Sequence, residues 1–188
     1  MKYTPTGYAW ILIVFATLFL IGGIDQTTKD ALKVQHILKT IERTPQATGN
    51  EERAAEVTEK EVNAYISYRL AREKKPVVSS LTVNLMGNNH VQGKISFDAD
   101  QLNLGGLLGE GLDFDFKGVV QTRNHTARLN LIALSLGGYA VKPQVLDFVL
   151  SSAAMAHHTD VGRVDDWYEL PKGIKRVIIQ KTKAVLYY

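Results

Sequence analysis

The sequence predicts an α+β fold: a single N-terminal transmembrane helix, then a curved antiparallel sheet of hairpins wrapped around one or two helices. Three observations predict this fold class. Residues 8–24 form an uncharged apolar run, the segments 78–97 and 114–131 each alternate apolar and polar residues around a turn sequence, and an apolar stretch follows Pro143. A period of two is typical of a half-buried strand, and a period near 3.6 is typical of a helix.

The apolar run at residues 8–24 (YAWILIVFATLFLIGGI) is long enough to cross most of a roughly 30 Å hydrocarbon layer as a helix. A cleaved secretory signal needs a basic front end and small residues in the A-x-A form. Lys2 is the only basic side chain before the run, and Gly22-Gly23 lacks that form. We therefore interpret the run as a retained single-pass anchor in the cell membrane. A long domain after such a run is exported largely regardless of flanking charge, so we expect it outside the cytoplasm, in the periplasm.

The chain divides into three predicted regions: an anchor at 1–24, an amphipathic stalk helix and linker at 25–50, and one α+β domain at 51–188. The stalk carries an apolar stripe with helical spacing. Its members are Ala31, Val34, Leu38 and Ile41. This stripe needs a cover, which is the chain's own domain, a neighbouring subunit or the bilayer surface. The net charge of +3 is spread along the chain, so we expect no nucleic-acid partner.

A second helix is predicted to begin at Thr58. Thr58 and Glu61 have the spacing of a capping box, in which each side chain binds the other residue's backbone N–H. An apolar face follows, and Pro76 ends the helix. The face consists of Val62, Tyr65, Ile66 and Leu70. A helical extension over residues 51–57 is a further expectation.

Hairpins are predicted where the alternation meets residues that tolerate positive φ. The turns are expected at 87–89 and 123–125, and a third hairpin is expected around 181–183. The stretch after Pro143 is apolar over much of its circumference, so we expect a largely buried helix there. The predicted order is helix, hairpin, hairpin, helix, hairpin.

Catalytic and metal signatures are weak. The glycine-rich segment 105–111 lacks the lysine and the spacing of a phosphate-binding loop. His157-His158 and Asp160 offer metal-ligand residue types, but adjacent helical residues point about 100° apart and no second cluster completes a site. The sequence therefore predicts no enzyme, no cofactor and no metal site.

The strongest functional signal is the apolar inner face of the predicted sheet. A curved sheet rolled over an apolar helix either closes on that helix or leaves a gap the size of a lipid tail. The predicted groove consists of Val62, Ile66, Leu81, Val83, Ile95, Phe97, Phe114, Phe116, Leu129, Leu131 and Leu146. Gly93 and Gly118 lie on the same face, where they either make room for a ligand or permit close packing. We favour close packing.

Four segments carry a resemblance to a known group of proteins. They are VTEKEVNAYI at 57–66, an LxVxL strand followed by NNHVQGKISF at 88–97, the apolar helix after Lys142-Pro143, and LPKGIKRVII at 170–179. Over roughly residues 55–188 the chain resembles bacterial membrane-anchored lipid-binding-like proteins related to the tubular lipid-binding (TULIP-like) group. The resemblance implies a curved sheet around a helix, an apolar groove for lipid tails and no enzymatic activity.

Two functional hypotheses follow. In the first, a membrane-tethered, non-enzymatic domain binds or passes membrane lipid through its apolar groove. In the second, the chain is a structural accessory subunit of a larger membrane protein complex. Its anchor and the stripe Ala31, Val34, Leu38 and Ile41 then contact partner helices.

Overall fold

The computed structural model describes residues 26–44, 52–73, 76–98, 102, 111–156 and 162–188. This part of the chain is α+β, with a curved antiparallel half-barrel sheet, a smaller sheet and three helices. None of the helices in it is long and apolar enough to cross a membrane. The fold class is therefore corrected, because the single transmembrane helix included in it is not among the helices observed. The stretch 8–24, which carried that prediction, lies outside the described residues.

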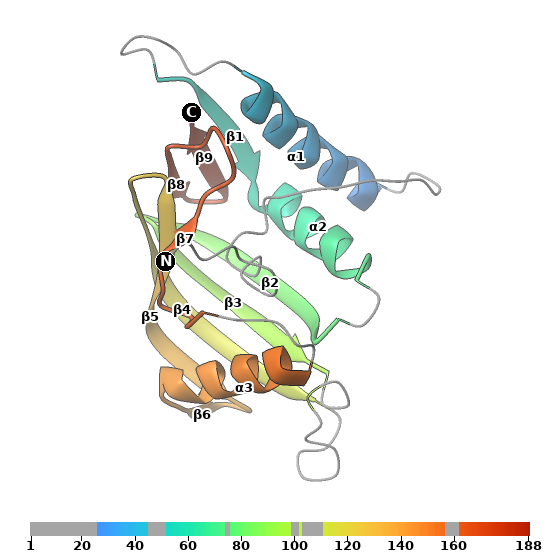
Figure 1. Cartoon of the computed structure of the whole chain (residues 1–188), viewed down its shortest axis with the longest axis vertical. Helices are drawn as coiled ribbons and strands as arrows, with labels where there is room; N and C mark the ends of the chain where they lie inside the picture. Colours follow the sequence, from blue (N-terminus) through green and yellow to red (C-terminus); the bar gives the residue numbers. More distant parts are fainter. Residues whose placement is uncertain (1–25, 45–51, 74–75, 99–101, 103–110, 157–161) are drawn as a thin grey trace.

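The larger sheet forms the half-barrel, with strand order β2-β3-β4-β5-β6 and with β7 paired to β5. The strands are β2 (Val78–Gly87), β3 (His90–Phe97), β4 (Leu112–Arg123), β5 (Thr126–Leu136), β6 (Tyr139–Ala140) and β7 (Tyr168–Glu169). Figure 1 shows the curvature of this sheet, with helix α2 (Glu59–Leu70) towards its upper end and helix α3 (Pro143–Ala156) across its lower end.

Both predicted hairpins of the larger sheet are confirmed. The β2–β3 turn places Asn88 and Asn89 at φ values of 51° and 61°, and the β4–β5 turn places Asn124 and His125 at 47° and 61°. Asparagine tolerates this left-handed region better than most residues, because its short side chain hydrogen-bonds locally. The turn residues thus set the register in which the apolar residues of neighbouring strands share one face.

The smaller sheet has the order β1-β9-β8, with β1 at Ala54–Thr58, β8 at Arg176–Gln180 and β9 at Lys183–Tyr187. The C-terminal hairpin β8–β9 is confirmed. The suggested helical extension over 51–57 is wrong, because residues 54–58 pair antiparallel with β9. Only Val57 is buried in this five-residue strand, so its own sequence carries almost no alternation. A partner at the far end of the chain defines β1.

Helix α1 (Gln26–Arg43) packs against α2, and its whole predicted stripe is buried. Of the three covers considered for the stripe, the structure shows the chain's own domain. Ile41 reaches across to Gly173, where an added Cβ would lie 3.0 Å from Ile41 Cγ2. The stripe is therefore part of the hydrophobic core in this structure, and it is not available to partner helices.

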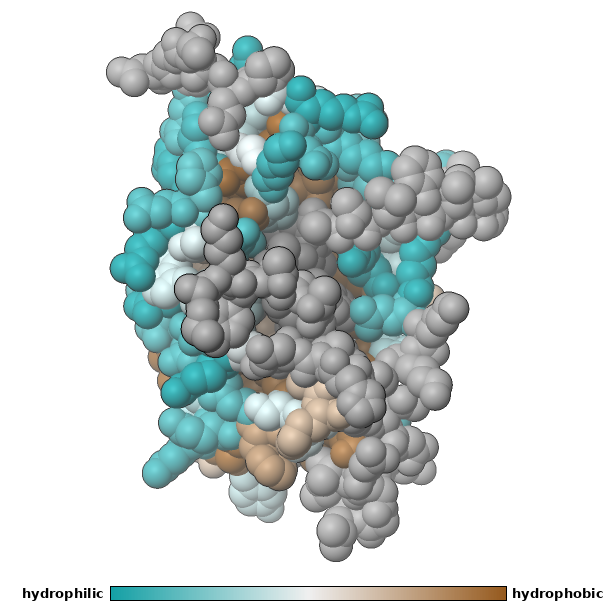
Figure 2. Space-filling view, in the orientation of Figure 1, coloured by the Kyte–Doolittle hydropathy of each residue, from teal (hydrophilic) through white to brown (hydrophobic). Residues whose placement is uncertain are grey.

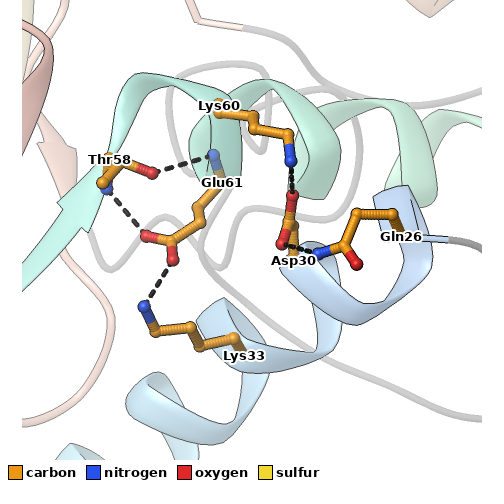
Figure 3. Close-up of polar contacts among 6 residues, drawn as sticks. All are labelled: Gln26, Asp30, Lys33, Thr58, Lys60 and Glu61. Atoms are coloured by element: carbon orange, nitrogen blue, oxygen red, sulfur yellow. Dashed lines mark hydrogen bonds and ion pairs between the residues drawn. The ribbon is translucent and has the colours of Figure 1, made fainter.

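Two ion pairs connect α1 and α2 (Figure 3). Lys33 Nζ lies 2.5 Å from Glu61 Oε1, and Lys60 Nζ lies 2.8 Å from Asp30 Oδ2. The second carboxylate oxygen of Glu61 accepts from the Thr58 N–H at 2.8 Å, and the Glu61 N–H donates to Thr58 Oγ1 at 3.3 Å. The predicted capping box is confirmed, and its glutamate also binds α1.

Helix α3 is buried on one side only. Its inner face includes Leu146, Val149 and Leu150, whereas Phe148 is 63% and Met155 70% exposed. The prediction of a largely buried helix is therefore wrong. The helix lies across the end of the half-barrel, with Phe148 and Met155 on its exposed side, and Figure 2 shows hydrophobic surface at this lower end.

Candidate functional site

A cavity of about 190 Å³ lies inside the half-barrel. Its wall combines β2–β5 with α2, α3, residues 162–170 and the smaller sheet. Nearly all of the lining side chains are aliphatic or aromatic. Protein interiors contain few voids larger than a water molecule, so a cavity of this volume is the strongest candidate for a binding site in the described structure.

Nine of the eleven predicted groove residues line this cavity. They are Val62, Ile66, Leu81, Val83, Ile95, Phe116, Leu129, Leu131 and Leu146.

Phe97 and Phe114 do not line the cavity. Their rings pack edge to face with centroids 5.8 Å apart, and the residues are 1% and 0% exposed. The alternation placed them on the correct face of the sheet. The alternation of apolar and polar residues does not show how far the cavity extends along each strand. The rings of Phe97 and Phe114 fill the end of the barrel and do not border the cavity.

Other lining residues were missed by the sequence reasoning. Leu85 and Val91 follow the same alternation as their predicted neighbours, so the pattern contained a signal for them. No comparable signal exists for Val164, which lies in an irregular segment. The further lining residues include Tyr65, Val120, Ala127, Leu150, Tyr168, Leu170, Val177, Ile179 and Ala184.

Close packing, the favoured reading of Gly93, agrees with the structure. A Cβ at this position would lie 2.7 Å from Phe116 Cζ and 2.2 Å from the carbonyl oxygen of Thr82. At Gly118 a Cβ would lie 2.8 Å from Leu129 Cδ1. The two glycines therefore allow the side chains of Phe116 and Leu129 to lie against the strands. Both of these side chains form part of the cavity wall.

Residues 162–170 close one side of the cavity. The Val164 N–H donates to Asp147 Oδ1 of α3 at 2.9 Å, and Arg163 Nε lies 3.7 Å from the other oxygen of this carboxylate. The Tyr168 hydroxyl donates to the carbonyl oxygen of Arg163 at 2.5 Å. Burial raises the pKa of Tyr168, and the nearby Asp166 raises it further. Tyr168 therefore stays a neutral hydrogen-bond donor that holds this wall in place.

The single charged residue among the lining residues, Arg128, directs its charge elsewhere. Its Nε donates to Gln121 Oε1 at 2.8 Å, and its guanidinium lies 4.8 Å from the ring centroid of Trp167. Arg128 alternates along β5 with Ala127 and Leu129, which both line the cavity. Successive side chains of a strand point to opposite faces, so the guanidinium belongs to the outer face of the sheet.

Tyr65 is the aromatic residue that α2 contributes to the wall. Tyr65 lines the cavity from α2 and is 1% exposed, and its hydroxyl oxygen is itself buried. Burial raises the pKa of Tyr65, and a side-chain hydrogen bond with Arg69 acts in the opposite direction. The hydroxyl is therefore a neutral donor at neutral pH.

Metal binding has no support in the described ranges, which contain no group of three His, Asp or Glu side chains able to hold an ion. His157, His158 and Asp160 lie outside those ranges, as does most of the glycine-rich segment 105–111.

Comparisons with protein-family models, with curated proteins and with solved structures returned no match. The resemblance to the tubular lipid-binding group therefore stays a prediction from the sequence.

Proposed function

We propose that this protein binds the hydrocarbon tail of a lipid-like molecule inside the half-barrel, without changing it chemically. The observation that carries the proposal is the cavity of about 190 Å³ with its nearly continuous apolar lining. Such a wall attracts hydrocarbon and offers no group that activates a substrate.

The cavity volume sets the size of the tail. A 150 Å³ apolar cavity accommodates benzene, which has six carbon atoms. By the same ratio, a cavity of 190 Å³ accommodates about eight carbon atoms. At about 0.8 kcal/mol for each buried methylene, the transfer of such a tail from water is favourable by about 6 kcal/mol. Association itself costs about 4–15 kcal/mol, so the tail alone supports weak binding and the rest depends on the remainder of the ligand.

An alternative reading treats the cavity as a packing defect. At about 24 cal/mol per Å³, 190 Å³ left empty of both ligand and water costs up to about 4–5 kcal/mol of stability. That cost is a large fraction of the 5–15 kcal/mol by which native domains are stable. A retained cavity of this size is therefore better explained by a ligand that fills it.

Methyl NMR of the delipidated protein tests the proposal, because the cavity wall is rich in leucine, isoleucine and valine. On titration with n-octane, the methyl resonances of Leu81, Leu129 and Leu146 are expected to shift. The resonances of Leu38 and Ile41, which are buried on α1 and do not line the cavity, serve as the internal control. Equal shifts in both groups, or no shift in either, contradict binding in the cavity.

The accessory-subunit hypothesis loses its proposed contact surface on α1, because the stripe there is buried. Copurification under mild detergent tests it, and a chain that migrates alone argues against it.

A further inference from the structure

The wall of the cavity has one irregular side. Its lining residues belong to strands and helices, apart from Gly162, Val164 and Leu170. The Leu170 N–H donates to the carbonyl oxygen of His125 at 2.8 Å, so this residue is fixed to the β4–β5 turn. Gly162 is the exposed member of the lining set, so the wall reaches the molecular surface at this point.

Residues 163–166 form a turn that is closed by its own hydrogen bonds. The Asp166 N–H donates to the Arg163 carbonyl oxygen at 3.1 Å, and the Arg163 N–H donates to Asp166 Oδ2 at 2.8 Å. The Tyr168 hydroxyl of β7 donates to the same carbonyl oxygen, so the turn is joined to β7. Val164 lies within the turn, lines the cavity and is 8% exposed. The turn can therefore move as a unit about β7 and carry Val164 out of the wall.

One carboxylate of α3 ties this turn to the helix. Asp147 Oδ1 accepts from the Val164 N–H at 2.9 Å, and Asp147 Oδ2 lies 3.7 Å from Arg163 Nε. The Arg163 side chain is 62% exposed, so this long ion pair contributes little. The bond from the Val164 N–H is charge-assisted and reaches a carboxylate that is only 16% exposed. It is therefore the main tie between the turn and α3 among the described contacts.

We propose that the turn 163–166 is the gate of the cavity and that Asp147 is its latch. This inference rests on the proposed function, because a gate needs a cavity that takes up a ligand. When the Val164 N–H leaves Asp147, the turn moves away from α3, and the tail passes between the turn and Leu146 and Leu150. A passage through the strands or helices of the wall requires the loss of several backbone hydrogen bonds, whereas this gate requires the loss of one and of a weak ion pair.

A gate has a kinetic signature that a binding contact lacks. Asp147 is not among the lining residues, so its bond to the turn acts on the empty and on the filled cavity alike. Weakening such a latch raises the association and dissociation rates by the same factor and leaves Kd unchanged. The loss of a ligand contact, in contrast, acts mainly on the dissociation rate and therefore raises Kd.

The test measures 1-octanol binding to the delipidated full-length protein by NMR line-shape analysis, which gives both rates. Asp147→Ala removes the acceptor and is expected to raise both rates about ten-fold, with Kd unchanged. Asp147→Asn keeps an oxygen that accepts from the Val164 N–H, and its rates are expected to stay close to those of the wild type. Asp165→Ala is the matched control, because Asp165 Oδ1 lies 3.4 Å from the same Arg163 Nε. It is expected to change neither rate.

Val164→Pro breaks the latch from the other side. Proline has no N–H to donate, and it suits the second position of a turn such as 163–166. Both rates are expected to rise about ten-fold, as in Asp147→Ala. Wild-type rates in this variant contradict the gate, and the measurement does not require that Asp147→Ala folds.

The outcomes separate the gate from the proposed function. If 1-octanol binds in the cavity and Asp147→Ala leaves both rates unchanged, the gate is wrong and the proposed function stands. A faster dissociation with a proportionally higher Kd also overturns the gate, because Asp147 then stabilises the complex and not the closed turn. Equal acceleration in Asp165→Ala overturns it as well. If the wild type does not bind 1-octanol, both proposals fail.

Discussion

A larger side chain at position 127 is expected to fill part of the cavity. It should therefore weaken ligand binding while it stabilises the folded protein. Ala127 lines the cavity on β5, opposite Thr122 of β4 and Tyr168 of β7. Ala127→Leu adds three carbon atoms, which at the benzene ratio occupy about 75 Å³ of the cavity.

The magnitude follows from this volume. At about 24 cal/mol per Å³, the filled space raises the free energy of unfolding of the ligand-free protein by about 2 kcal/mol. The ligand loses room for about three methylenes at about 0.8 kcal/mol each, so the affinity for 1-octanol falls about fifty-fold.

Urea unfolding of the delipidated protein measures the first quantity, and methyl NMR titration with 1-octanol measures the second. Ala133→Leu is the matched control, because it makes the same substitution on the same strand at an exposed position. It is expected to leave 1-octanol affinity unchanged. A destabilised Ala127→Leu protein that binds 1-octanol as tightly as the wild type would refute the reasoning, because the added side chain then does not enter the space that the ligand uses.

Three further changes test the framework around the site. Gly93→Ala would place a Cβ 2.2 Å from the Thr82 carbonyl oxygen, so we expect a loss of about 3 kcal/mol in chemical denaturation, and an unchanged midpoint would contradict the packing. Glu61→Gln keeps the capping box but removes the ion pair with Lys33, which is partly exposed, so we expect a loss of about 1 kcal/mol or less at neutral pH. Burial opposes ionisation of Glu61, but Lys33 and the cap outweigh it and lower the pKa below 4.5; its stabilisation is thus present at neutral pH and disappears as the pH falls through that lowered value. Unfolding measured from pH 7 to pH 3 should show a smaller acid loss for Glu61→Gln than for the wild type, and parallel curves would argue against the pair. Phe97→Ala should cost about 3–5 kcal/mol of stability while the folded fraction keeps its 1-octanol affinity, whereas weaker binding would place this ring in the cavity wall after all.

The amino-acid sequence determined the features of this protein that depend on neighbouring residues. Alternation along 78–97 and 114–131 identified the face of each strand, and asparagine-rich turns identified where the chain reverses. The spacing of Thr58 and Glu61 identified a helix start. Each of these rests on backbone geometry and on hydrogen bonds within a few residues.

Other features depended on contacts between distant parts of the chain. β1 exists because β9 lies beside it, and the stripe of α1 is covered because α2 and the domain core receive it. The sequence also did not predict that Phe148 is exposed. Apolar residues occur around much of α3, so the pattern does not show which side of the helix packs against the rest of the protein.

Both kinds of information meet in the cavity. The sequence by itself identified which side chains face the interior, because a strand's alternation has a period of two. Only the tertiary structure decided that Phe97 and Phe114 fill the barrel end and that space remains beside Phe116. Whether a side chain fills a space depends on the atoms that surround it on every side. The sequence pattern along one strand shows only which face of the sheet the side chain is on.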